Sequence, residues 1–198
     1  MELVLASASP RRVELLQLLG LRFAQQPADI DETHRAPETP RQYVRRMALE
    51  KARLVAASHS ADKVVIGADT TVLVDDQILG KPTDRADGLA MLQLLSGRSH
   101  QVLTGLCVLH GDQQRLEVVE SQVWFRTLEA AEAERYGASG EPADKAGGYG
   151  IQGIGSIFVE RIEGSYSGVM GLPLAALETQ LRAVGFDVWS HTDRSTGG

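Results

Sequence analysis

The apolar segment from Lys63 to Val74 constrains the fold of this chain more than any other stretch. Its sequence, KVVIGADTTVLV, is rich in β-branched residues and is typical of a strand buried in the core of a sheet. Asp69 interrupts the segment, and no lysine or arginine lies between Val64 and Val74 to pair its charge. Burying an isolated carboxylate costs several kcal/mol. A cation, a metal ion or a proton must therefore offset the charge of Asp69.

Helix and strand signals alternate along the rest of the chain. A short strand over residues 3–6 precedes a helix that is expected to start at Ser9 and Pro10 and to end at Gly20. Thr39, Pro40 and Gln42 predict a capping box at the start of a second helix. Further strands are expected at 101–109, 116–125 and 157–162, a hairpin turn at 75–77, and further helices at 84–95, 127–136 and 173–184. Because the strands are linked both by hairpins and by helical crossovers, we predict an α/β fold with a mixed β-sheet and flanking helices.

The length and composition favour a single folded domain. With 198 residues, 43% of them hydrophobic, the chain can bury a full core as one compact domain or as two joined lobes. We assign this domain to residues 1–190. Residues 191–198 carry no apolar side chain and are expected to fray.

Charge and cysteine usage limit the compartment and the partners. The single cysteine, Cys107, has no intrachain disulfide partner, which favours a reducing compartment. The N-terminus lacks a basic leader and no apolar run approaches the roughly 20 residues that span a bilayer, so we expect a cytoplasmic protein without a membrane partner. The net charge of −6 argues against general nucleic-acid binding. A polyanionic ligand would need local basic contacts and a divalent cation.

Basic residues at three places in the sequence could supply such contacts. Arg11 and Arg12 fall in the first turn of a predicted helix, where the helix dipole disfavours cations unless an anion binds there; pointing into solvent is an equally good alternative. Lys51 lies on a mostly apolar helix row, where a lysine more often extends to the surface. Lys81, within Gly-Lys-Pro, could be a solvated turn residue. In combination, these residues favour a phosphate site.

Acidic residues offer the complementary chemistry. Asp69 could be a metal ligand, a general base for water or an acceptor for backbone N–H groups, and its place inside a strand favours a functional role. Glu32 and Asp31 would supply further carboxylates for Mg²⁺ or Mn²⁺, hard ions that take oxygen ligands and keep positions for phosphate and water. On a polar loop, however, such residues are more commonly only solvated.

A glycine-rich stretch precedes the last predicted strand. Residues 148–153, GYGIQG, match the pattern G-x-G-x-x-G, but the dinucleotide-binding fingerprint needs a strand before it and a helix after it, and here a strand follows. The glycines would let the backbone approach a flat ligand such as a base, with Gln152 offering its amide. The alternative is a mobile linker.

Several short motifs also stand in a fixed order between Leu3 and about Gly185. They are LASASPRR at 5–12, DE at 31–32, EKA at 50–52, GADT at 67–70, GKP at 80–82, LSG at 95–97 with His100, AGGYGIQG at 146–153 and GVMGLP at 168–173. Their order and separation closely resemble the Maf family of nucleoside triphosphate pyrophosphatases. The resemblance covers nearly the whole chain and is far more specific than any one motif.

The resemblance implies a Maf/Ham1 (ITPase-like) architecture with two lobes around a cleft, and a homodimer. It also implies hydrolysis of a nucleoside triphosphate to the monophosphate and pyrophosphate with a divalent metal cation, Mg²⁺ or Mn²⁺. In it, Asp69 matches the proton acceptor, and Glu32 with Asp69 matches the metal site. The positions associated with the phosphate site are Ser7, Arg12, Lys51 and Lys81.

Within the family, Arg11, Thr70 and Gln152 match the positions that separate subfamilies. They resemble the dTTP/UTP pyrophosphatase branch, with modified pyrimidine nucleotides as further candidate substrates. A 7-methyl-GTP-type pyrophosphatase, which carries a bulky aromatic residue, a glutamine and a glutamate there, is the alternative within the family. A nucleotide-responsive cell-division regulator with incidental hydrolysis is an alternative of a different class. A sugar-nucleotide-handling transferase would need an acceptor site that the sequence does not reveal.

Overall fold

The computed structural model describes residues 1–192, which divide into two compact units. The first unit comprises Met1–Asp69, Thr104–Val119 and the chain from Gly171 onward, and the second comprises Thr70–Leu103 and Glu120–Met170. The prediction of a single domain over residues 1–190 stays a prediction. Of the expected tail, His191 ends a short helix and Thr192 forms a β-bridge with Leu21, while residues 193–198 lie outside the described part.

A mixed sheet of seven strands forms within the described residues, in the order β2-β1-β3-β5-β6-β7 with β4 paired to β3. Strand β1 runs parallel to both β2 and β3, whereas β4 is antiparallel to β3 and β7 is antiparallel to β6. The combination confirms the predicted mixed α/β fold. The strands are β1 (Glu2–Leu5), β2 (Phe23–Gln25), β3 (Lys63–Val74), β4 (Gln77–Leu79), β5 (Ser99–His110), β6 (Gln113–Phe125) and β7 (Val159–Glu163).

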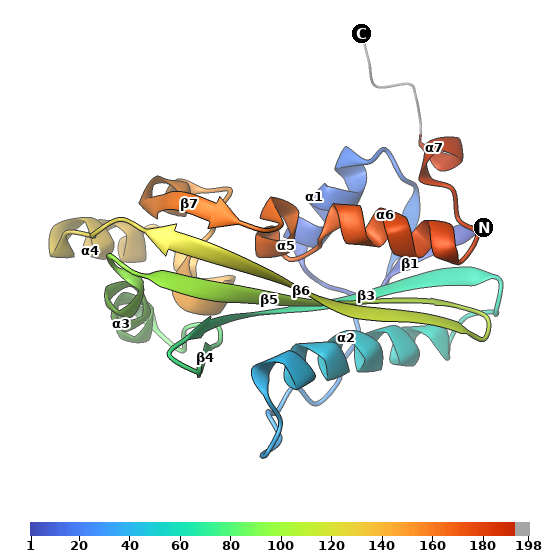
Figure 1. Cartoon of the computed structure of the whole chain (residues 1–198), viewed down its shortest axis with the longest axis horizontal. Helices are drawn as coiled ribbons and strands as arrows, with labels where there is room; N and C mark the ends of the chain where they lie inside the picture. Colours follow the sequence, from blue (N-terminus) through green and yellow to red (C-terminus); the bar gives the residue numbers. More distant parts are fainter. Residues whose placement is uncertain (193–198) are drawn as a thin grey trace, which may run out of the picture. The chain divides into compact units, whose positions relative to one another are not determined.

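The first unit places helices on both faces of its strands. Figure 1 shows α2 along one face, and α1 and α6 along the other. The α2 helix begins with the predicted capping box, in which the Gln42 backbone N–H donates to Thr39 Oγ1 (3.2 Å) and the Thr39 N–H donates to Gln42 Oε1 (2.8 Å). The helices of this unit are α1 (Pro10–Leu18), α2 (Pro40–Ala56), α6 (Leu174–Ala183) and α7 (Val188–His191).

Two glycines let the backbone of α2 lie directly on the sheet. A Cβ atom on Gly67 of β3 would stand 2.3 Å from the Ala48 carbonyl oxygen, and one on Gly105 of β5 would stand 2.2 Å from the Val44 carbonyl oxygen. Neither position can carry a side chain without moving the helix. The close approach seals a small apolar cluster, which includes the buried Cys107, and it fixes where α2 presents its side chains.

The second unit is built around its own apolar core of strand, helix and loop residues. Its hairpin turn joins β3 to β4 at the predicted position. Asp75 and Asp76 form the turn with positive φ values of 47° and 63°. Its other elements are α3 (Arg85–Leu95), α4 (Ala130–Ala138), α5 (Tyr166–Met170) and three 3₁₀ segments, η1 (Glu141–Asp144), η2 (Ala146–Gly148) and η3 (Ile154–Phe158).

The expected start of α4 at Thr127 is wrong. The Leu128 N–H donates to Ser96 Oγ (2.7 Å), and residues 126–129 are not helical. Glu129 is the N-cap instead and forms a capping box with Glu132. A distant contact therefore overrides the local signal.

In residues 1–192, no helix is long and apolar enough to cross a membrane.

Candidate functional site

Asp69 lies on β3 at the end of the first unit, where its side chain is almost fully buried. The Lys51 ammonium donates to Asp69 Oδ1 at 2.7 Å, and the Lys51 side chain is equally buried. Burial raises the pKa of the Asp69 carboxyl above its ordinary value, while the charges of Lys51 and Arg12 oppose the rise. Of the three groups that could offset this carboxylate, namely a cation, a metal ion or a proton, the structure shows a cation, Lys51 of α2.

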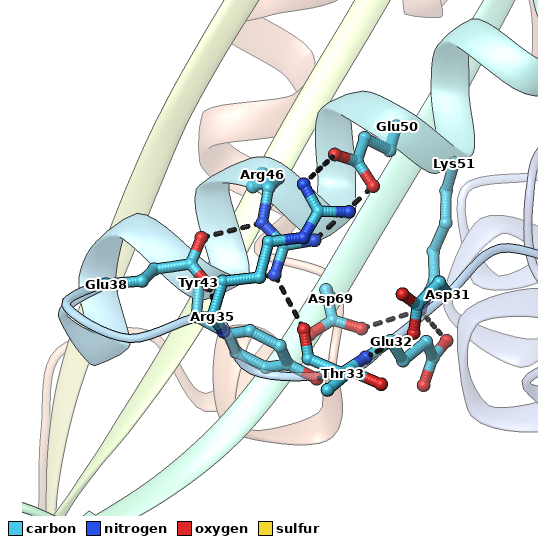
Figure 2. Close-up of polar contacts among 10 residues, drawn as sticks. All are labelled: Asp31, Glu32, Thr33, Arg35, Glu38, Tyr43, Arg46, Glu50, Lys51 and Asp69. Atoms are coloured by element: carbon cyan, nitrogen blue, oxygen red, sulfur yellow. Dashed lines mark hydrogen bonds and ion pairs between the residues drawn. The ribbon is translucent and has the colours of Figure 1, made fainter.

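Glu32 approaches the same ammonium from a loop. Lys51 Nζ lies 2.6 Å from Glu32 Oε1, so one nitrogen contacts both carboxylates (Figure 2). The Glu32 side chain is about half exposed at 53%, in contrast to Asp69. Its neighbour Asp31 turns to a local role, in which Oδ1 accepts the Thr33 backbone N–H at 2.9 Å. Glu32 is therefore the loop acid that the fold brings to Asp69.

Arg12 turns inward from the first turn of α1. Its Nε donates to the Gly171 carbonyl oxygen (2.8 Å) and its Nη1 donates to Ser7 Oγ (3.1 Å), and both Arg12 and Ser7 are buried. Burial lowers the pKa of the Arg12 guanidinium, and the negative charge of Asp69 opposes this effect. The alternative that Arg12 points into solvent is thus wrong. Arg11 is partly exposed.

The remaining predicted site residues belong to the second unit. Thr70 follows Asp69 on β3 and is partly exposed, whereas Lys81, just after β4, and Gln152, between η2 and η3, are exposed. That Lys81 and Gln152 lie near Asp69 stays a prediction.

The loop that carries Gln152 is organised around the Glu141 carboxylate. That carboxylate accepts hydrogen bonds from the backbone N–H groups of Ile154 (2.8 Å) and Gly155 (3.1 Å) and from the Tyr136 hydroxyl (2.9 Å). A Cβ atom on Gly153 would stand 2.5 Å from the same carboxylate. Such a network favours a built loop over the mobile linker that the sequence left open.

Sequence reasoning missed two contributors to the site. Gly171 supplies the carbonyl that orients Arg12, and the GVMGLP motif marked its position without indicating its partner. Tyr43 of α2 is the second contributor, because its hydroxyl donates to the Glu32 carbonyl oxygen at 3.0 Å. A tyrosine three residues before an arginine on a helix that faces an acidic loop was the available signal.

The residues of the first unit form a coherent chemical arrangement. A buried carboxylate with a raised pKa can accept a proton, and two buried cations beside it can bind an anion. Among residues 1–192, no group of three or more His, Cys, Asp or Glu side chains stands close enough together to hold a metal ion by itself. Glu32 and Asp69 can still share a hard cation whose other ligands come from phosphate and water.

Comparison with known proteins gives consistent matches. The family model described as Maf-like protein matches residues 2–184. The chain is 53% identical to a dTTP/UTP pyrophosphatase of Alcanivorax borkumensis, over 88% of this chain and 91% of that protein. It is 50% identical to a dTTP/UTP pyrophosphatase of Hahella chejuensis, over 95% of this chain and 94% of that protein. The solved structure of the Staphylococcus aureus Ham1 protein is more distant, with 18% identity, 62% of this chain and 70% of that chain covered, and a TM-score of 0.43.

Proposed function

Because the chain belongs to the Maf family, we propose that it is a nucleoside triphosphate pyrophosphatase that hydrolyses dTTP and UTP to the monophosphate and pyrophosphate. The relatives that bear this name share about half of their residues with it over nearly their whole length. The observation that carries the proposal is the buried Asp69 carboxylate, held by Lys51 beside the buried Arg12.

In the proposed reaction, Asp69 takes a proton from the water that attacks the α-phosphorus. The bond between the α-phosphorus and the bridging oxygen breaks, and pyrophosphate leaves. The raised pKa of Asp69 supports this role, because a general base works best when its pKa approaches the operating pH. Ser7 supports it indirectly, since its hydroxyl accepts from Arg12 and holds the guanidinium in place.

Cationic groups stabilise the charge of the triphosphate and of the leaving pyrophosphate. We assign this role to Arg12, Lys51 and Lys81, since phosphoryl chemistry depends chiefly on positioning and electrostatics. Arg12 and Lys51 are already held in place by Gly171 and Asp69. Such preorganised donors need little rearrangement when the substrate binds.

A divalent cation, Mg²⁺ or Mn²⁺, fits the carboxylates of Glu32 and Asp69. Both are hard oxygen donors within reach of one ammonium, and an ion with only two protein ligands can take its remaining ligands from phosphate oxygens and water. When bound, the ion would neutralise charge on the triphosphate. Lys51 would then be shared between Asp69 and the phosphates.

Substrate preference is assigned to Arg11, Thr70 and Gln152. Uracil and thymine present two carbonyls and one N–H, which a glutamine amide can match. The exposed Gln152 on a well-anchored loop supports this assignment. The triple change Gln152→Glu, Thr70→Gln and Arg11→Trp should shift preference toward 7-methyl-GTP.

The decisive experiment measures pyrophosphate release from a nucleotide panel by the purified chain. The panel contains dTTP, UTP, CTP, ATP, GTP and 7-methyl-GTP, each with Mg²⁺, with Mn²⁺ and without metal. We expect release from dTTP and UTP with metal. Release of orthophosphate instead, or no release from any nucleotide, would overturn the proposal, and nucleotide binding without turnover would favour the regulator.

Asp69→Asn tests the base directly. The variant should lose turnover by at least about a thousandfold, within the range for general-base catalysis combined with site electrostatics, and should still bind nucleotide. Asp112→Asn, an equal change in the exposed turn between β5 and β6, is the matched control. Wild-type turnover by Asp69→Asn would rule out the base.

A homodimer in the cytoplasm remains part of the proposal, to be checked by light scattering and by localisation of the tagged chain.

A further inference from the structure

The segment that carries Glu32 belongs to no helix or strand. Residues 26–39 connect β2 to α2 with only a turn at residues 36–37. The Glu32 side chain is 53% exposed, so burial does little to hold it in place. Yet its carboxylate meets the Lys51 ammonium at 2.6 Å. Some other part of the molecule must position this segment.

Arg46 of α2 binds the segment at two points (Figure 2). Its Nε donates to Glu38 Oε1 (2.7 Å) and its Nη2 to Glu38 Oε2 (2.8 Å), which is the paired geometry of a strong guanidinium–carboxylate contact. The same Nη2 donates to the Thr33 carbonyl oxygen (3.0 Å). A weaker contact of 3.4 Å joins Arg46 to Glu50. The Arg46 side chain thus binds both Thr33, the residue after Glu32, and Glu38 near the end of the segment.

This ion pair differs from an ordinary surface salt bridge. The Arg46 and Glu38 side chains are only 16% and 12% exposed, so solvent screens their attraction weakly. The hydrogen bonds from Arg46 lower the pKa of the Glu38 carboxyl, which keeps the pair charged throughout the neutral range. Glu38 also accepts the Arg35 backbone N–H at 3.3 Å and so closes the segment on itself.

Tyr43 provides a second hold, one helical turn before Arg46. Its hydroxyl donates to the carbonyl oxygen of Glu32 itself (3.0 Å), and the Arg46 guanidinium lies 5.7 Å from the centre of its ring. Tyr43, Arg46 and Glu50 are spaced three and four residues apart, so they share one face of α2 beside the row of Lys51. The helix that positions Lys51 therefore also positions the loop acid.

We propose that Arg46, assisted by Tyr43, is a positioning residue that holds Glu32 against Lys51 and Asp69 and thereby sets the affinity of this carboxylate pair for a divalent cation. The inference rests on the proposed function for its metal. Arg46 itself donates to Glu38, Glu50 and Thr33 and acts through the loop backbone. Outer contacts that orient metal-binding carboxylates typically change metal affinity by about 10- to 100-fold when they are removed.

The test compares Arg46→Ala, Arg46→Lys and Arg53→Ala in the full-length chain. Arg53 lies on the same helix, is exposed and donates to the Gln114 side chain at 3.0 Å, which makes it a matched control. Mn²⁺ binding is measured by calorimetry on the nucleotide-free protein, and hydrogen exchange is followed in peptides that cover residues 29–38. Steady-state kinetics with UTP are then recorded across Mn²⁺ concentrations.

For Arg46→Ala we expect about tenfold weaker Mn²⁺ binding and faster exchange confined to residues 29–38. At saturating Mn²⁺, kcat should return to within about threefold of the wild-type value, because Asp69 and Lys51 are retained. Arg46→Lys should recover only part of the affinity, since an ammonium cannot reproduce the paired contact with Glu38. Arg53→Ala should match the wild type in every measurement.

Tyr43→Phe keeps the test valid if Arg46→Ala does not fold. It removes only the hydroxyl bond to Glu32, and it should weaken Mn²⁺ binding about two- to threefold. Unchanged Mn²⁺ affinity and unchanged exchange in both Arg46→Ala and Tyr43→Phe would overturn the inference. An Arg46-dependent Mn²⁺ affinity in a protein that releases no pyrophosphate would refute the proposed function and leave the positioning role in place.

Discussion

Removing the Lys51 charge should lower the free energy of unfolding, because the buried Asp69 carboxylate would lose the cation that pairs with it. In Lys51→Met the side chain keeps most of its length and loses its charge, so Asp69 stays buried without the ammonium that lies 2.7 Å away. Breaking a buried ion pair on one side costs about 3–5 kcal/mol. We expect about 3 kcal/mol, at the lower end, because the nearby charge of Arg12 also favours ionised Asp69. The contact with the half-exposed Glu32 should add less than about 1 kcal/mol.

A double-mutant cycle with Asp69→Asn isolates this interaction. Urea unfolding at pH 7 gives the free energy of unfolding of the wild type, both single variants and the double variant. The double variant buries neither charge, so its loss should be at least about 2 kcal/mol smaller than the sum of the two single losses. If the losses add to within about 0.5 kcal/mol, Lys51 and Asp69 are not energetically coupled and the reasoning fails.

The pH dependence gives the same prediction an independent readout. The pKa of Asp69 is raised in the folded state, so its protonated form favours folding. The corresponding stability is fully present below the unfolded pKa of about 3.9 and is lost as pH rises through the folded value. Without Lys51 the folded pKa should rise further. The destabilisation by Lys51→Met should therefore be largest at neutral pH and shrink as the pH falls toward 4.

Two further predictions concern packing and the second unit. Gly67→Ala should lower the free energy of unfolding, measured in urea, by about 3 kcal/mol, because its Cβ would stand 2.3 Å from the Ala48 carbonyl oxygen. Gly80→Ala is the control and should change the free energy of unfolding by less than about 0.5 kcal/mol, since nothing lies within 4 Å of its Cβ. Equal effects of the two substitutions would contradict the packing argument. Burial lowers the pKa of His100 to about 4, so the stability that its neutral ring provides is complete above about pH 6.5 and falls by about 3 kcal/mol as the pH drops toward 4. His100→Gln should flatten this decline in a urea series from pH 7 to 4, and an unchanged slope would show that His100 does not titrate as stated.

The fold was predictable where local chemistry and tertiary structure agree. Thr39 and Gln42 cap α2 as their spacing requires, and Asp75 and Asp76 turn the hairpin. Lys51 and Asp69 were both identified as unusual because each charge interrupts an apolar pattern. The interruption was visible at both positions, but the expectation that a lysine at position 51 more often extends to the surface was wrong, because the Lys51 side chain is buried against Asp69.

The contacts between these elements were not predictable, because they depend on partners far apart in the chain. Nothing in the sequence indicates that Arg46 pairs with Glu38 rather than with solvent, or that the Gly171 carbonyl accepts from Arg12. The start of α4 moved from Thr127 to Glu129 through a bond from Leu128 to Ser96. Strand β2 and helices α5 and α7, with three, five and four residues, are too short to produce a periodic signal.

Gly67 and Gly105 allow the α2 helix to lie closer to the sheet than any residue with a side chain would permit. Because neither residue has a Cβ atom, the backbone of α2 can approach β3 and β5 closely. In a library of random variants, survivors should be sparse at these two positions and plentiful at Leu54 on the outward side of the same helix. The position of the Lys51 ammonium against the Asp69 carboxylate would then depend on two residues that have no side chain.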